Sequence, residues 1–341
     1  MSTIREVAKR AGVSAMTVSR VLNNSASVRP TTRERVLEAI LTLQYVPNPA
    51  ARTLSSSRSR TIALVVADLT NPFFTQIAKG VEAVARQEGF GLILNNTDED
   101  PDREGESLQV VRAARVDGVV WVPCGDQSTA SARILIDNQL PTVLVDRLIP
   151  GAPYFDAVIS DNRAGAKALA NTLLHAGRAP LGAVFGRSET SVVRDRRLGF
   201  QDALAGYGIP WDDAFAMNSD AIHPDKSLLT TMRAAVPEIS GVIAWNNVAA
   251  AEIFREASAL NLRVPEDLVI ATFEDPDPYH LVPEVFVVGQ QNPFRMGAES
   301  ARLLLERLRN PEDTASKTEI LPITVEVGSH ALAVPKTGLS L

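Results

Sequence analysis

Residues 7–23 read VAKRAGVSAMTVSRVLN, and this stretch has the pattern of a helix-turn-helix. Apolar residues recur at helical spacing before Gly12 and again after Ser14, which predicts helices over about 4–11 and 15–23. Gly12 permits the positive φ of a tight turn, and Ser14 is a good N-cap for the second helix. A capping box, Thr3 to Glu6, predicts the start of the first helix.

A third helix is expected over about 32–43. The segment Thr31-Thr32-Arg33-Glu34 has the pattern of a second capping box, and four apolar residues follow at helical spacing, namely Val36, Leu37, Ile40 and Leu43. Three apolar stripes can close one small core, which leaves the second helix free to enter the major groove of DNA. The alternative is a generic three-helix bundle with a solvated basic face.

The candidate DNA-contacting residues of this module lie at the starts of its helices and along the second helix. They are Thr3, Ser14, Ala15, Met16, Thr17, Ser19, Arg20 and Asn23. Ala15 and Met16 suit thymine methyl groups, whereas Arg20 can donate two hydrogen bonds to guanine O6 and N7. Thr17, Ser19 and Asn23 are short polar groups that suit phosphates, which fix register without reading sequence.

The charges of the chain are divided unevenly. Its 341 residues carry 34 Lys and Arg and 40 Asp and Glu, a net charge of −6. Residues 1–60 hold ten of the basic residues and three of the acidic ones, a net of +7, so the remaining residues sum to −13. A basic module is the electrostatic footprint of polyanion binding. We therefore expect a small basic DNA reader joined to a larger acidic body.

Between the two parts, residues 47–60 predict a conditional helix. Asn48 and Pro49 form an N-cap followed by proline at the first helical position, and serines begin at Ser55. A helix of about two turns is marginal in water, so we expect it to form when a partner buries Leu54. The alternative is a flexible interdomain linker.

From residue 60 onward, short apolar strands alternate with longer helices, which predicts a βαβ chain with parallel sheets. The expected strands are 62–67, 91–95, 118–122, 142–145, 157–160, 181–185, 241–245, 268–273 and 285–288, and the expected helices include 75–88, 104–115, 164–175, 196–206 and 249–260. Nine strands are more naturally divided between two sheets than kept in one. We therefore expect an α/β fold in which two doubly wound lobes share a cleft at their strand ends.

Several classes of protein are disfavoured by the sequence. It shows no signal segment and no apolar run that could span a bilayer, which predicts a soluble cytoplasmic protein. Cys124 is the only cysteine, so thiolate zinc sites and intramolecular disulfides are excluded. The four histidines lack metal-ligand spacing, and no glycine-rich nucleotide loop or nucleophile elbow occurs. We expect neither an enzyme nor a cofactor.

Polar residues at successive strand ends indicate a binding cleft instead. Phe73 and Phe74 follow the first strand and could stack on a sugar or base, although core packing is expected for one of them. Asp146-Arg147, Asp161-Asn162 and Trp245-Asn246-Asn247 each end a later strand, and Arg196 opens a helix. Carboxylate, guanidinium and amide groups that converge in this way suit polyhydroxylated ligands.

Residues 7–23, together with Asn48-Pro49-Ala50-Ala51-Arg52-Thr53-Leu54, resemble the LacI/GalR family of bacterial transcription regulators, and the resemblance extends more loosely to about residue 327. It implies that paired hinge helices of a dimer enter the minor groove, where Leu54 wedges into the central base step and kinks the DNA. Ala50 and Ala51 would then allow close approach of helix to helix and of helix to groove.

The same resemblance implies an effector cleft in the acidic body. It implies stacking by Phe73 or Phe74 and hydrogen bonds from Asp146, Arg147, Asp161, Arg196 and Asn246. The family usually has a Gly-aromatic-Asp-Asp run where this chain reads Thr272-Phe273-Glu274-Asp275. Glu274 thus occupies the usual ligand-binding aspartate position with one more methylene, which weakens any transfer of ligand identity.

Taken together, the sequence predicts a homodimeric repressor that binds a near-palindromic operator and responds to a sugar, sugar acid or nucleoside. The expected divisions are a DNA-binding domain (1–46), a hinge helix and linker (47–60), an effector-binding and dimerisation domain (61–330) and a tail (331–341). The body resembles a periplasmic binding protein, with lobes of about 61–161 plus 291–322 and 162–290 plus 323–330. The rival classes are a secreted sugar-binding protein, which has no use for residues 1–60, and an α/β enzyme with a basic arm.

Overall fold

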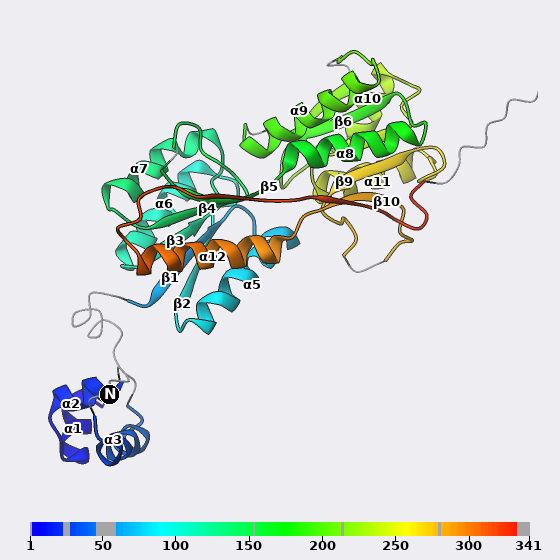
Figure 1. Cartoon of the computed structure of the whole chain (residues 1–341). Helices are drawn as coiled ribbons and strands as arrows, with labels where there is room; N and C mark the ends of the chain where they lie inside the picture. Colours follow the sequence, from blue (N-terminus) through cyan, green and yellow to red (C-terminus); the bar gives the residue numbers. More distant parts are fainter. Residues whose placement is uncertain are drawn as a thin grey trace, which may run out of the picture. The chain divides into compact units, whose positions relative to one another are not determined.

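The computed structural model describes residues 2–22, 28–45, 59–152, 154–187, 189–212, 215–278 and 281–332. The chain divides into two compact units, Met1–Ser59 and Arg60–Leu341 (Figure 1). The first unit is helical. The second contains two parallel-sheet lobes, which confirms the predicted α/β class.

Three helices make up the first unit, α1 (Ile4–Ala11), α2 (Ala15–Leu22) and α3 (Pro30–Thr42). Each helix contributes a fully buried valine to one core, namely Val7, Val18 and Val36. The Thr3 hydroxyl accepts from the Glu6 N–H, and the Glu6 carboxylate accepts from the Thr3 N–H at 2.7 Å, so the predicted capping box is present. Gly12 turns the chain between α1 and α2 at a φ of 64°.

Two details of the predicted third helix are wrong. Helix α3 begins at Pro30, whose ring fixes a helical φ, so Thr31 lies inside the first turn and no side chain caps the helix. Leu37 is 47% exposed, because the buried positions of α3 are Val36 and Ala39. The predicted contact Asn23 lies outside the described residues.

The first lobe of the larger unit is built on a six-stranded parallel sheet. Its strands are β1 (Thr61–Val66), β2 (Gly91–Asn96), β3 (Gly118–Trp121), β4 (Thr142–Val145), β5 (Asp156–Ser160) and β11 (Thr318–Leu321), in the order β11-β5-β4-β3-β1-β2. Side chains of β1 alternate between two cores, since Ile62 and Leu64 pack on one face and Ala63 and Val65 on the other.

The second lobe repeats this plan. Its strands are β6 (Leu181–Gly186), β7 (Ala216–Ser219), β8 (Gly241–Ala244), β9 (Val269–Phe273), β10 (Phe286–Gln290) and β12 (Thr324–Val327), in the order β12-β10-β9-β8-β6-β7. All neighbours are parallel except β10 and β12. Each sheet reverses its strand order beside its first strand, and such a switch point opens a crevice at the carboxyl ends of the strands.

Helices cover the sheets of both lobes. The first lobe has α5 (Pro72–Gln87), α6 (Pro101–Ala113), α7 (Thr129–Asp137), α12 (Pro293–Arg309) and the short η1 (Asp126–Ser128), and the second has α8 (Asn162–His175), α9 (Ser191–Gly206), α10 (Leu228–Ala235) and α11 (Asn247–Ala259). Helices α5 and α12 lie side by side (Figure 1). A Cβ at Gly80 would overlap the Phe294 carbonyl, and one at Gly297 would overlap the Ile77 carbonyl. These two glycines therefore set how closely the helices approach.

Three connections join the lobes. They run from β5 to α8, from β10 to α12 and from β11 to β12, and the last crosses between the lobes in the red segment of Figure 1. Strands β7, β11 and β12 are absent from the sequence-based prediction. Each is an edge strand of four residues with several polar or exposed positions, so its apolar signal is weak.

Candidate functional site

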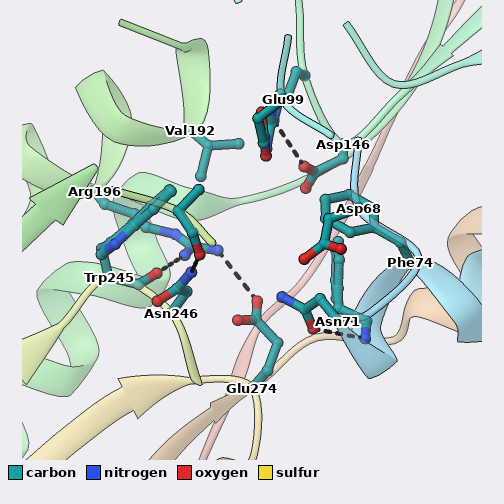
Figure 2. A pocket seen from close by; sticks show the side chains of 13 residues that line it. Asp68, Asn71, Phe74, Glu99, Asp146, Val192, Arg196, Trp245, Asn246 and Glu274 are labelled. Atoms are coloured by element: carbon teal, nitrogen blue, oxygen red, sulfur yellow. Dashed lines mark hydrogen bonds and ion pairs between the residues drawn. The ribbon is translucent and has the colours of Figure 1, made fainter. Parts of the chain in front are cut away.

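A hollow lies where the carboxyl ends of the strands in both lobes meet (Figure 2). Its empty space, counted out to the open mouth, is about 410 Å³. The lining residues are Asp68, Asn71, Phe73, Phe74, Glu99, Asp146, Arg147, Val192, Arg196, Ala221, Trp245, Asn246 and Glu274. The first seven come from the first lobe and the other six from the second. We call this hollow the cleft.

Arg147 anchors the first-lobe wall of the cleft. It follows β4 and is buried, and its two terminal nitrogens each lie 2.6 Å from an oxygen of Glu99. Its Nε lies 3.4 Å from the Asp146 carboxylate, and it also donates to the Pro123 carbonyl. Burial lowers the pKa of Arg147, but Glu99 and Asp146 raise this pKa by more than burial lowers it. The guanidinium therefore stays charged. This bidentate pair is a rigid support.

Arg196 anchors the second-lobe wall. It comes from α9, stacks 3.6 Å above the Phe273 ring centroid, and donates from Nε to Asn162 Oδ1 at 2.8 Å. Another of its nitrogens donates to the Trp245 carbonyl, and a third lies 3.5 Å from Glu274 Oε1. Burial lowers the pKa of Arg196, and Glu274 and Asp146 oppose that shift.

Two carboxyl groups of the cleft, those of the buried Asp146 and the half-buried Glu274, are shifted towards their neutral forms. Burial raises the pKa of Asp146, against the opposing effect of Arg147 and Arg196. Burial also raises the pKa of Glu274 to about 7, and Asp146 adds to the rise while Arg196 opposes it. Gln291 donates a hydrogen bond to Glu274 Oε1. The cleft can therefore change its charge near neutral pH, through Glu274.

Aromatic rings stand on both sides of the cleft. Phe73 and Phe74 are both buried and meet edge to face, with ring centroids 5.2 Å apart, so each serves both core and lining. Trp245 lies on the opposite wall, and its Nε1 is buried without a hydrogen-bond partner among the described residues. Trp245 is absent from the predicted effector-binding residues, although it directly follows β8 and so carries the same strand-end signal as Asn246.

Two predicted site residues act as helix caps. Asn246 lines the cleft, while its Oδ1 accepts from the Ala249 N–H at 2.9 Å and so caps α11. Asp161 does not line the cleft. It is exposed, and its carboxylate accepts from the Ala164 N–H at the start of α8, so we leave Asp161 out of the site.

Six lining residues are absent from the sequence-based set. Val192, Ala221 and Trp245 come from the second lobe, and the other three come from the first. Asp68 follows β1, Asn71 caps α5, and Glu99 lies in the loop after β2. Each occupies the carboxyl end of a strand or the loop beyond it. The rule that selects Asp146 could therefore have selected Asp68 and Glu99 as well.

Direct hydrogen bonds hold the two lobes together around the cleft. Asn71 and Asn247 exchange two amide hydrogen bonds of 3.1 and 3.2 Å, and both residues are buried. Arg194 pairs with Asp126 at 2.6 Å, and the Leu148 N–H donates to the Ser191 hydroxyl at 2.9 Å. The lobes are thus clasped, and opening the cleft must break these contacts.

In the first unit, the predicted DNA contacts are distributed along α2. Met16 is 66% exposed, and Arg20 follows it by four residues, exposed on the same side of the helix. Ala15 is half-buried against the core. The Ser14 hydroxyl accepts from the Thr17 N–H at 3.1 Å, and Thr17 and Ser19 are half-buried. Thr3 is exposed at the start of α1, and the predicted Ala50, Ala51 and Leu54 lie outside the described residues.

Alternative chemistry has little support in the part of the chain that the structure describes. No group of three or more His, Cys, Asp or Glu residues there could hold a metal ion, and none of the helices described is long and apolar enough to cross a membrane. Burial and the nearby Glu104 raise the pKa of the Cys124 thiol, which keeps it protonated. Such a buried neutral thiol is a poor nucleophile.

Comparison with known proteins agrees with this arrangement. Residues 59–329 match the model "Periplasmic binding proteins and sugar binding domain of LacI family", and residues 3–48 match "Bacterial regulatory proteins, lacI family". The ribose operon repressor of Bacillus subtilis (strain 168) is 33% identical over 325 residues, covering 95% of this chain and 97% of that protein.

Two solved structures are also similar. A LacI family transcriptional regulator from Enterococcus faecium with bound ribose is 27% identical, with a TM-score of 0.66 over 78% of this chain and 96% of that one. The lac repressor dimer bound to operator and the anti-inducer ONPF has a TM-score of 0.83 over 97% and 99% of the two chains, at 22% identity. The second comparison concerns the fold alone.

Fold and cleft define a class of protein in which a ligand-binding body of the periplasmic-binding-protein type is joined to a helix-turn-helix unit. The chain belongs to the LacI family of bacterial regulatory proteins. It is a DNA-binding transcriptional regulator under effector control and not an enzyme, as the sequence predicts.

Proposed function

We propose that this regulator binds a near-palindromic operator as a homodimer, and that a small polyhydroxylated effector in the cleft controls the binding. The convergence of strand-end side chains from both lobes on one hollow carries the proposal. The lobes can be clasped by their hydrogen bonds or opened by breaking them. A ligand that touches both walls binds these two forms with different affinity, and only a ligand with such a difference can shift the equilibrium between them. As a DNA-bound regulator it would act in the cytoplasm.

The proposed roles in the cleft follow from the contacts. Phe74 and Trp245 line opposite walls with apolar rings, and Asp146 and Glu274 offer carboxylate oxygens. Arg147 and Arg196 hold these carboxylates in place. Because one relative is named a ribose operon repressor and one similar structure holds ribose, pentoses belong first in any screen.

The proposed DNA reader is α2. Met16 and Arg20 are its exposed long side chains, and among the described residues Arg20 has no hydrogen bond or ion pair. Arg20 is therefore available for a bidentate contact with guanine. The domain divisions at residues 46, 60 and 330 and the minor-groove role of Leu54 are part of the same proposal.

The test is to select DNA from a random pool with the full-length protein and then titrate the selected duplex with candidate sugars. We expect two half-sites related by dyad symmetry, and a sugar that changes the DNA affinity at least about tenfold, which corresponds to a coupling free energy near 1.4 kcal/mol. Arg20→Ala should lose the selected sequence and keep sugar binding. A selected site without dyad symmetry would contradict the homodimer, and a DNA affinity insensitive to every sugar that binds would contradict effector control.

A further inference from the structure

We propose that the cleft selects effectors with hydroxyl donors and no negative charge, so that it accepts a neutral monosaccharide and rejects the carboxylated or phosphorylated form of the same sugar. The inference rests on the proposed function, in which a small polyhydroxylated molecule occupies the cleft. It narrows the ligand class from sugar, sugar acid or nucleoside to an uncharged polyol ring.

The first observation is the charge balance of the lining. Four carboxyl groups face the hollow, from Asp68, Glu99, Asp146 and Glu274, against two guanidinium groups. The lining carries two negative charges when all six groups are ionised, one when Glu274 is protonated, and none when Asp146 is protonated as well, so it never becomes positive. An anion placed among buried like charges is strongly disfavoured, because the low dielectric of the site strengthens the repulsion.

The second observation is that both guanidinium groups are already occupied by acceptors of the protein. Arg147 donates to both oxygens of Glu99 and to a main-chain carbonyl. Arg196 donates to Asn162 and to the Trp245 carbonyl and lies beside Glu274. A carboxylate or phosphate is usually held by an arginine fork that is free to receive it. Neither arginine of the cleft can present such a fork without breaking its own buried contacts.

The third observation is that the cleft offers free acceptors. Oδ1 of Asp68 accepts from the N–H and the hydroxyl of Thr70, whereas no described residue donates to its Oδ2. Glu274 also receives its hydrogen bond from Gln291 at Oε1. In Figure 2 both carboxyl groups point into the hollow. These oxygens suit the hydroxyl donors of a sugar ring and repel a further carboxylate.

The fourth observation is the acidic approach to the cleft. A neighbouring hollow shares Asp68 and Glu99 with the cleft, and carries three more carboxylates, from Asp98, Asp100 and Asp220. Its one arginine, Arg103, is paired with Asp98 and Asp100. A ligand that enters on this side therefore passes a negative surface, which lowers the association rate of anions.

The test compares matched sugars on the full-length protein by isothermal titration calorimetry at pH 7.5. The probes are D-ribose with D-ribonate and ribose 5-phosphate, and D-glucose with D-gluconate and glucose 6-phosphate. We expect a neutral sugar to bind and its two anionic partners to bind at least about 100-fold more weakly. An anionic member that binds within tenfold of its neutral parent overturns the proposal, and so does a panel in which no neutral sugar binds.

Variants separate charge selection from a general loss of binding. Asp68→Asn should lower the ratio of the affinity for the neutral sugar to the affinity for its anionic partner about tenfold. The reason is that this change removes one negative charge and keeps the side-chain shape. Glu312→Gln is the matched control, since Glu312 is exposed in the loop after α12 and lines neither hollow. An unchanged ratio in Asp68→Asn overturns the proposal. Operator binding, measured separately, reports on the proposed function itself.

Discussion

The buried carboxyl group of Glu274 gives the regulator a pH-dependent stability that can be measured. Its pKa rises from the usual 4.5 to about 7, chiefly through burial. The folded state therefore holds a proton that the unfolded chain releases above about pH 4.5, so Glu274 lowers stability as pH rises towards 7. The full penalty is on the order of 3 kcal/mol, at 1.36 kcal/mol per pKa unit, and about 2.5 kcal/mol of it develops between pH 5 and 8.

Glu274→Gln removes the titrating group and preserves the shape of the side chain. Relative to the parent chain, we expect the variant to gain about 2.5 kcal/mol of stability between pH 5 and pH 8. Urea unfolding at a series of pH values measures this difference. Tryptophan fluorescence is a suitable signal, because Trp121, Trp211 and Trp245 all lie in the larger unit.

The difference between the two proteins cancels the groups that do not interact with Glu274. Asp146 does interact with Glu274, so the measured difference includes any change in the titration of Asp146. A difference that stays constant within about 0.5 kcal/mol from pH 5 to 8 would show that Glu274 keeps its usual pKa, and would refute the account of its burial. A difference of the opposite sign would mean that Arg196 stabilises the charged form more than burial penalises it.

Three further outcomes are expected. Gly297→Ala should lower the free energy of unfolding by about 2 kcal/mol or more in urea titrations, because its Cβ would overlap the Ile77 carbonyl across the α5–α12 contact. Asn247→Ala should open the clasp with Asn71, and small-angle X-ray scattering of the ligand-free protein should show a larger radius of gyration than the parent gives; an unchanged radius would mean that the other interlobe contacts suffice. Leu54→Ala should weaken operator binding and leave sugar affinity intact, and fluorescence anisotropy of labelled operator DNA measures the first of these. An unchanged DNA affinity would exclude the insertion of Leu54 into a base step.

The sequence predicts the fold well wherever local signals are strong. The limits of α1 agree with the prediction, because its capping box and Gly12 fix both ends. The second predicted capping box fails for a local reason as well, since Pro30 starts the helix one residue before Thr31. Edge strands such as β12 carry alternating polar residues and are recognised only through their neighbours in the sheet.

The cleft is predicted less completely than the fold. Asp146, Arg147 and Asn246, which the strand-end rule selects, line the cleft. The same rule selects Asp161, which caps α8 and lies outside the lining, because the rule cannot separate these two roles. The pairing of Arg147 with Glu99 depends on loops 48 residues apart. Such pairing follows from the three-dimensional arrangement of the strands, and no local pattern in a single sequence specifies it.

The point where the larger unit begins bears on how the cleft could reach the DNA. Arg60 is the first residue of that unit and is fixed to the first lobe by several contacts. Its N–H donates to Asp117, its guanidinium donates to the carbonyls of Glu88 and Gly89, and it stacks on Phe90. Among the described residues, the chain thus enters the larger unit through the first lobe. A change in the angle between the lobes therefore changes the position of this attachment point relative to the second lobe.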